Sequence, residues 1–223
     1  MITFYFHHTP NPMKVALMLE EAQLAYEVVP VDIFKGEQHT PAYRAINPNG
    51  KVPAIVDDGV VVFDSNAILL YLAEKTGRFL GSPADRAALL SWLMFVASGL
   101  GPYSGQAVHF GRIHTDSPYA TNRYRREVGR HYDILNQRLA DRPFIVGDDY
   151  TIVDMAAWGW IGRASTIFNA EAVLDTVPNL KRWFALVDSR PAAARARLIG
   201  RDIPFKSDFD DETKRAMFPQ NFA

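Results

Sequence analysis

The chain has 223 residues and a formal net charge of -1, and 48% of its residues are hydrophobic while 22% are charged. This length can bury one large core or two smaller ones, and the near-neutral charge argues against nucleic-acid and anionic-membrane partners. There is no cysteine, which excludes protein disulfides, thiolate metal sites and a protein thiol nucleophile.

The first 80 residues alternate between strand and helix patterns. Their start, MITFYFHHTPNP, lacks the basic region and long apolar run of a secretory leader. No run of about 18 apolar residues occurs either, so we expect a cytoplasmic protein without a membrane span. Strands are expected at 2–6, at 26–31 and in a hairpin around Asp57–Gly59, and helices at 12–23, 41–46 and 65–75. This β-α-β-α-β-β-α order predicts an α/β domain over residues 1–80 that resembles the thioredoxin fold.

After residue 80 the strand patterns stop. The segment GRFLGSP at 77–83 is a plausible linker, and residues 84–223 are predicted to form an all-helical domain. Thr151 and Asp154 have the spacing of a capping box at the start of one of its helices, which is a structural signal. The expected helices of this domain are 84–112, 120–141, 152–169, 178–189 and 191–198, followed by a short one near 210–218.

The most informative segment is 46–75, INPNGKVPAIVDDGVVVFDSNAILLYLAEK. It places a Val-Pro turn before a hairpin, and then an Asp-Ser pair at the start of a helix. Each part alone is ordinary, because a stability turn and a capped helix explain it. The ordered series is more specific, since a cis X-Pro turn frees backbone groups and a helix start aims free N–H groups at a carboxylate.

This series resembles the glutathione-binding half of a glutathione transferase. The resemblance implies that the Val52–Pro53 peptide is cis and that Val52 offers its backbone groups to the cysteinyl part of glutathione. It also implies that Asp64 and Ser65 hold the amino end of the tripeptide, although Asp64 stands where the family commonly has Glu. Lys51 belongs to the matching Asn-Gly-Lys-Val-Pro run, and Gln38 stands where a glutamine of the family reaches the glycyl carboxylate.

The chemistry is expected at the first strand–helix junction, His7 to Pro12. Thr9-Pro10-Asn11 resembles the nu-class bacterial transferases, related to the yeast prion-forming nitrogen regulator, and so implies that Thr9 and Asn11 contact the glutathione sulfur. Asn11 also looks like a helix N-cap before a proline at the first helical position. Plain turn and cap residues are the alternative reading of Thr9 and Asn11. Tyr5 is expected to pack beside the sheet instead.

Two further groups of residues have open roles. His7 and His8 are adjacent in a strand and point to opposite faces, so we expect no metal site there. The helix 120–141 carries Arg123, Arg125, Arg126 and Arg130. One of them, taken as Arg130, is expected to anchor a glutathione carboxylate, although a solvated basic face is the common alternative. Aromatic side chains of the second half either line an acceptor site or belong to the core or a dimer interface: Trp92, Tyr103, His109 and Phe110.

Two classes of function remain open at this point. The resemblance implies a homodimeric enzyme that uses bound glutathione, or glutathione disulfide, against a small disulfide or electrophile. Because the chain has no cysteine, glutathione sulfur would then serve as both nucleophile and resolving thiol. The alternative is a glutathione-binding regulatory or ligand-carrying protein without useful turnover, and the fold alone does not separate the two.

Overall fold

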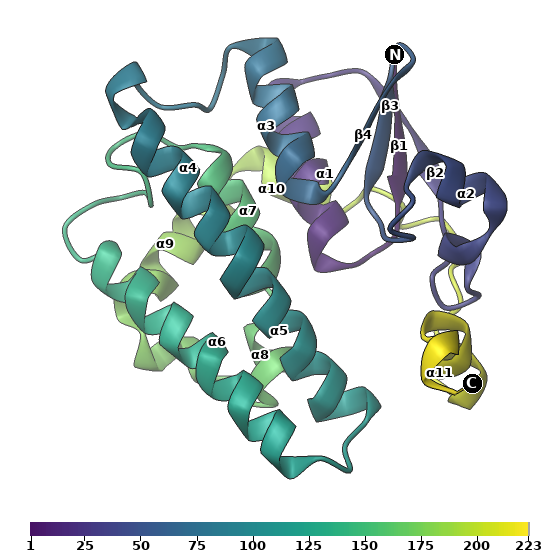
Figure 1. Ribbon diagram of the computed structural model, residues 1–223. Helices are drawn as coiled ribbons and strands as arrows, with labels where there is room; N and C mark the ends of the chain where they lie inside the picture. The colour runs from purple at the N-terminus through teal and green to yellow at the C-terminus, as the bar shows by residue number, and fades with distance from the viewer. Residues whose placement is uncertain (223) are drawn as a thin grey trace.

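A four-stranded sheet forms at the N-terminus, in the order β2-β1-β3-β4, and burial alternates along its central strand β1. The strands are β1 (Ile2–Phe6), β2 (Tyr26–Pro30), β3 (Ala54–Asp57) and β4 (Val60–Phe63). β1 pairs in parallel with β2 and antiparallel with β3, and the β3–β4 hairpin turns at Asp58 and Gly59, which both have positive φ. The computed structural model, shown in Figure 1, describes residues 1–222.

Helices α1 (Pro10–Ala22) and α3 (Ser65–Thr76) pack against each other, while η1 (Glu37–His39) and α2 (Pro41–Ile46) form the connection from β2 to β3. The predicted α/β part is therefore confirmed. The N-cap assigned to Asn11 is wrong, since the N-cap of α1 is Thr9. Pro10 takes the first helical position, where its fixed φ fits and its missing N–H costs nothing, so that Asn11 lies inside the first turn.

The helical part begins with one long helix that is interrupted twice. It comprises η2 (Pro83–Asp85), α4 (Arg86–Phe95), the π-helical η3 (Val96–Leu100), α5 (Gly101–Val108) and the π-helical η4 (His109–Ile113). The expected helix over 84–112 is thus present with two π segments. By length and composition this helix could cross a membrane, with a mean hydropathy of 1.2, but it packs against other helices of the bundle.

The remaining helices complete the bundle and the C-terminal tail. The helix expected over 152–169 is divided at Gly162, which is the C-cap of its first part. The elements are α6 (Pro118–Arg138), α7 (Ile152–Ile161), α8 (Ala164–Phe168), η5 (Val173–Thr176), α9 (Pro178–Asp188), α10 (Pro191–Ala196), α11 (Asp211–Met217) and η6 (Pro219–Asn221). In Figure 1, α11 lies beside the sheet domain near α2 rather than in the bundle.

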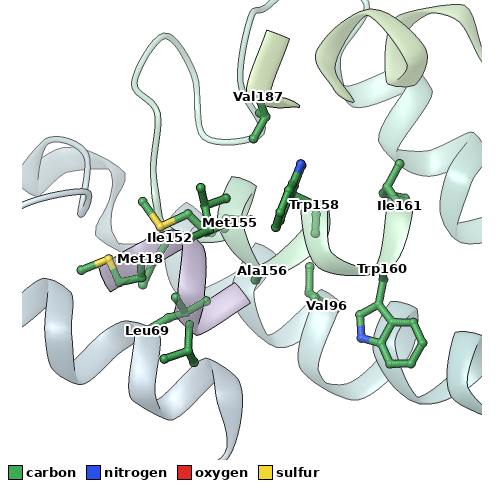
Figure 2. Packing of buried hydrophobic residues seen from close by; sticks show 14 of the residues in the cluster. Met18, Leu69, Val96, Ile152, Met155, Ala156, Trp158, Trp160, Ile161 and Val187 are labelled. Atoms are coloured by element: carbon green, nitrogen blue, oxygen red, sulfur yellow. The ribbon is translucent and has the colours of Figure 1, made fainter. Parts of the chain in front are cut away.

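Helix α7 is the common core element of both halves. It is buried along its length, and Figure 2 shows its side chains together with Met18 of α1, Leu69 of α3, Val96 of η3 and Val187 of α9. The approach to α1 is closest at Gly159, where a Cβ atom would lie 2.5 Å from the Pro10 carbonyl oxygen. Glycine is therefore required there, and this contact fixes the start of α1 against the helical bundle.

Candidate functional site

The Val52–Pro53 peptide is cis, as predicted. The turn is held from below, because the Lys51 carbonyl oxygen accepts hydrogen bonds from Tyr43 Oη and Asn47 Nδ2, each at 2.6 Å. The ladder between β1 and β3 begins only at the Tyr5–Ala54 pair. The backbone N–H and C=O of Val52 therefore lie outside the sheet, where an extended ligand can pair with them.

Helix α3 opens at the predicted Asp-Ser pair. Asp64 is the N-cap, with a positive φ of 71°, and its carboxylate accepts from the backbone N–H groups of Asn66 at 2.8 Å and Ala67 at 3.2 Å. Ser65 is the first helical residue, and its side chain is buried. The acid therefore occupies two of the free N–H groups of the helix and adds a negative charge where the dipole is positive.

The start of α1 carries both residues expected to contact a sulfur. Thr9, the N-cap, forms no capping hydrogen bond with its side chain. The Asn11 side-chain oxygen accepts a hydrogen bond from Trp160 Nε1 at 3.0 Å. Because an indole N–H can only donate, the Asn11 oxygen must face Trp160, and the amide NH2 group is the part left for a ligand.

Tyr5 is placed as expected, in the middle of β1. Its ring packs edge-on against Tyr43, with ring centroids 5.7 Å apart. Tyr5 pairs with Val29 of β2 and Ala54 of β3, so its backbone lies within the sheet and not at the N-terminal end of α1.

Two residues that were not predicted as site residues, Trp160 and Lys14, contact the starts of α1 and α3 from the protein interior. Trp160 orients Asn11, and Lys14 is buried with its Nζ donating to Ser65 Oγ at 3.3 Å. Burial lowers the pKa of Lys14 to about 7, and the negative charge of Asp64 opposes that shift. Lys14 has one signal in the sequence, because it stands in the otherwise apolar run KVALML, whose other side chains are buried.

The opposite end of the site is formed by η1 and the C-terminal tail. Gln38 is buried, its Nε2 lies 3.1 Å from His39 Nε2, and its Oε1 has no hydrogen-bond partner within residues 1–222. His39 Nε2 lies 3.2 Å from the Met217 carbonyl oxygen. Lys51 Nζ lies 5.9 Å from the ring centre of Phe218. The tail therefore lies against Lys51 and against His39, the neighbour of Gln38.

The aromatic residues considered for an acceptor site lie in different parts of the structure. His109 faces the site, since its ring lies 4.9 Å from that of Phe218, and burial, His114 and Lys51 together lower its pKa. Trp92 lies instead between helices, with the Arg138 guanidinium 5.3 Å from its ring centre. Tyr103 and Phe110 pack against Tyr124 of α6.

Arg130 lies on α6, with its Nε 3.1 Å from a carboxylate oxygen of Glu127. Figure 1 shows α4 and α5 between α6 and the sheet domain, so one chain does not bring Arg130 to Ser65 or Val52. The other arginines, Arg123, Arg125 and Arg126, line a separate pocket of about 700 Å³ on α6.

The histidine pair does not form a metal site. His7 is buried, with its Nε2 3.8 Å from an Asp32 carboxylate oxygen, and burial lowers its pKa to about 4 while Asp32 opposes the shift. The His8 ring packs edge-on against Phe6 and Phe205. Across residues 1–222 no three His, Cys, Asp or Glu side chains gather closely enough to hold a metal ion.

Comparison with known proteins assigns this arrangement to a family. Residues 8–75 match the family model of the glutathione S-transferase N-terminal domain, and residues 118–186 match that of the C-terminal domain. The chain belongs to the glutathione S-transferase family. The N-terminal match contains every candidate site residue from Thr9 to Ser65, and the C-terminal match contains Arg130 and Trp160.

Relatives within the family share most of the chain. The chain is 44% identical over 207 residues to the disulfide-bond oxidoreductase YfcG of Escherichia coli, covering 89% of this chain and 95% of that protein. A Pseudomonas fluorescens family member, solved with two glutathione bound, has a TM-score of 0.82 at 37% identity, covering 87% of this chain and 91% of that one. A Pseudomonas putida transferase, solved with one glutathione disulfide per subunit, also has a TM-score of 0.82, at 34% identity and 91% coverage of both chains.

Proposed function

We propose that the protein is a glutathione-dependent thiol–disulfide oxidoreductase and transferase of the nu class. The observation that carries the proposal is the convergence of the cis Val52–Pro53 turn and the starts of α1 and α3, in a chain without cysteine. Relatives named as disulfide-bond oxidoreductases, and family structures with glutathione or its disulfide bound, support it.

The reaction uses the sulfur of bound glutathione. Its thiolate attacks one sulfur of a disulfide RSSR, forming the mixed disulfide with glutathione and releasing the thiolate RS⁻. A second glutathione thiolate then attacks the glutathione sulfur of the mixed disulfide, which yields glutathione disulfide and the second RS⁻. Thr9 and Asn11 stabilise the attacking thiolate, because a hydroxyl and an amide NH2 at a helix start favour an anion and lower the thiol pKa.

The tripeptide lies across the edge of the sheet domain. Val52, which precedes Pro53, pairs with the cysteinyl backbone. Ser65 and the start of α3, which Asp64 caps, bind the γ-glutamyl end. Gln38 and Lys51 bind the glycyl carboxylate. The backbone groups of Val52, which lie outside the sheet ladder, support the pairing with the cysteinyl backbone.

A symmetric homodimer completes the proposal, with the sheet domain of one subunit, residues 1–80, against the helical domain of the other, residues 84–223. C2 pairing is the commonest closed assembly. In such a dimer Arg130 meets a glutathione carboxylate only from the partner's α6, since α4 and α5 separate it from the site of its own chain. The cytoplasm, where glutathione is abundant, is the proposed location.

Turnover separates this enzyme from a glutathione-binding regulator or carrier. The test is the rate of reduction of hydroxyethyl disulfide by glutathione, with and without the protein. An enzyme gives a rate that is proportional to protein concentration and is lost in the Asn11→Ala variant. A carrier binds glutathione in calorimetry but leaves the uncatalysed rate unchanged.

A further inference from the structure

Lys14 is enclosed to an unusual degree for a lysine, with 1% of its surface exposed. Lysine side chains are almost never fully buried unless they are paired. Helix α7 presses on its stem, since a Cβ atom on Gly159 would lie 2.9 Å from Lys14 Cγ. The Nζ group ends beneath the start of α3, where it donates to Ser65 Oγ at 3.3 Å.

The groups around the Lys14 amine carry too little negative charge to neutralise an ammonium group. The N-terminal ends of α1 and α3 both lie nearby, and their dipoles disfavour a cation. From α3 the facing groups are the neutral Ser65 and the carboxylate of Asp64, which is exposed and already accepts from two backbone N–H groups. From α7 the facing residue is Gly159, which carries no charge.

The other charged neighbours of α1 do not help. Arg163 and Arg197 line a pocket of about 310 Å³ beside Met13, and Arg197 pairs with Asp188, so this side offers Lys14 no anion. On the α10 side Arg195 pairs with Glu20 at the far end of α1. Burial accordingly lowers the pKa of Lys14 to about 7, with Asp64 as the opposing influence.

We infer that Lys14 takes up a proton when the γ-glutamyl carboxylate of glutathione docks beside Ser65, so that binding of the tripeptide charges a buried amine. The inference rests on the proposed function, because it needs the carboxylate at the α3 start. A serine hydroxyl has one proton and two lone pairs, so Ser65 can accept from Lys14 while donating to the carboxylate. The bound anion supplies the missing negative charge in a low-dielectric site. Lys14 is thus a positioning residue that acts through Ser65.

Proton uptake gives the site a defined pH dependence. Since the complex holds one proton more than its free components, affinity falls as pH rises above the Lys14 pKa of the free protein, which is about 7. The dissociation constant should rise by up to about tenfold per pH unit above that value, until the Lys14 pKa of the complex is reached. Below it Lys14 is already charged, and the coupling disappears.

The experiment is isothermal titration calorimetry with S-methylglutathione, whose blocked thiol cannot release a proton. Titrations at pH 8 in phosphate and in Tris, which differ in ionisation enthalpy, give the number of protons taken up per ligand. With a free pKa of about 7, the wild type should take up roughly 0.9 proton at pH 8 and about 0.1 at pH 6. Lys14→Met, which keeps the length of the side chain, should bind about tenfold or more weakly and take up essentially none.

His109 supplies the control, because it is a second titratable group of the candidate site, and burial, His114 and Lys51 lower its pKa. His109→Gln should keep the wild-type uptake at pH 8, and its loss there would assign the proton to His109 and overturn the inference. Should Lys14→Met not fold, Lys14→Gln, which retains a donor for Ser65, is judged by the same criterion. If the wild type binds S-methylglutathione without taking up a proton, or if the Lys14 variant takes up as many protons as the wild type, this inference alone is overturned. Failure of S-methylglutathione to bind overturns the proposed function as well.

Discussion

The N-terminal ends of α7 and of α1 use similar residues for opposite purposes. At α7 the carboxylate of Asp154 accepts from the backbone N–H groups of Thr151 at 2.9 Å and Ile145 at 3.0 Å, and from Trp183 Nε1 at 2.8 Å. At α1 the Thr9 side chain makes no capping bond. A helix start with all of its polar groups paired is structural, whereas one that leaves donors open is built for a ligand.

Each of these two helix starts also buries a titratable group, Asp154 at α7 and Lys14 at α1. The two groups differ in the number of hydrogen bonds that they form. Burial raises the pKa of Asp154 to about 6, while hydrogen bonds from four groups oppose the shift. Among residues 1–222, the Lys14 Nζ group has one hydrogen-bond partner, the Ser65 hydroxyl. The α7 cluster is therefore complete in the free protein, whereas we propose that a bound ligand completes the α1 cluster. The predictions below test this contrast.

The largest expected effect is on stability at the closed end. Asp154→Ala removes the acceptor of four buried donors and should lower the free energy of unfolding by about 3–4 kcal/mol. Urea unfolding followed by circular dichroism measures this loss. The exposed Asp148→Ala should change it by less than about 0.5 kcal/mol. The contrast fails if Asp154→Ala is as stable as Asp148→Ala.

The next effect is on rate at the open end. Thr9→Ala and Asn11→Ala each remove a hydrogen bond to a thiolate, worth about 1.5–3 kcal/mol, and should lower disulfide exchange by roughly one to two decades. Thr9→Ala should keep an unfolding free energy close to that of the wild type, because the Thr9 side chain makes no capping bond. Asn11→Ala also removes the acceptor of Trp160 Nε1 and should lower the unfolding free energy by about 1–3 kcal/mol. Tyr5→Phe should keep nearly full activity. A reversed pattern, with Tyr5→Phe inactive and both alanine variants active, would replace this assignment with a tyrosine-type transferase.

The two tryptophans of α7 give a smaller and sharper comparison. Trp160 donates to Asn11, whereas Trp158 donates to Asp188 Oδ1 at 2.8 Å. Trp160→Phe frees the Asn11 amide to rotate and should lower kcat by about fivefold, which is the worth of one ordinary hydrogen bond. It should also raise the pKa of the bound glutathione thiol, followed by absorbance at 240 nm. Trp158→Phe should leave that pKa unchanged, and equal shifts in both variants would remove the orienting role of Trp160.

The smallest effect concerns the C-terminal tail. Phe218 lies under the Lys51 ammonium, and such a cation–π contact is worth about 0.5–1 kcal/mol at an exposed site. Phe218→Ala should therefore raise KM for glutathione by roughly two- to fivefold and leave kcat unchanged. Steady-state kinetics at varied glutathione measures both, and a loss of kcat with constant KM would contradict this positioning role.

Sequence patterns predicted the fold, and they also predicted several structural features whose signals are local. The cis Val52–Pro53 turn, the Asp64–Ser65 helix start and the Thr151–Asp154 capping box each depend on a few neighbouring residues. Burial of Lys14 and the bond from Trp160 to Asn11 depend on α7 meeting α1, across 149 residues for the latter pair. No periodicity encodes such a contact. The π segments and the break at Gly162 were missed for the same reason, because tertiary packing sets them.

A crystal of the protein soaked with glutathione disulfide tests the central claim most directly. The proposed function requires a glutathione sulfur within hydrogen-bond distance of Thr9 Oγ1 and Asn11 Nδ2, about 3.0–3.5 Å, with Asn11 Oδ1 still facing Trp160. The γ-glutamyl carboxylate should lie at Ser65, and the Tyr5 hydroxyl should be out of reach of the sulfur. A sulfur bonded to Tyr5, or a tripeptide that leaves the start of α1 empty, would contradict the account.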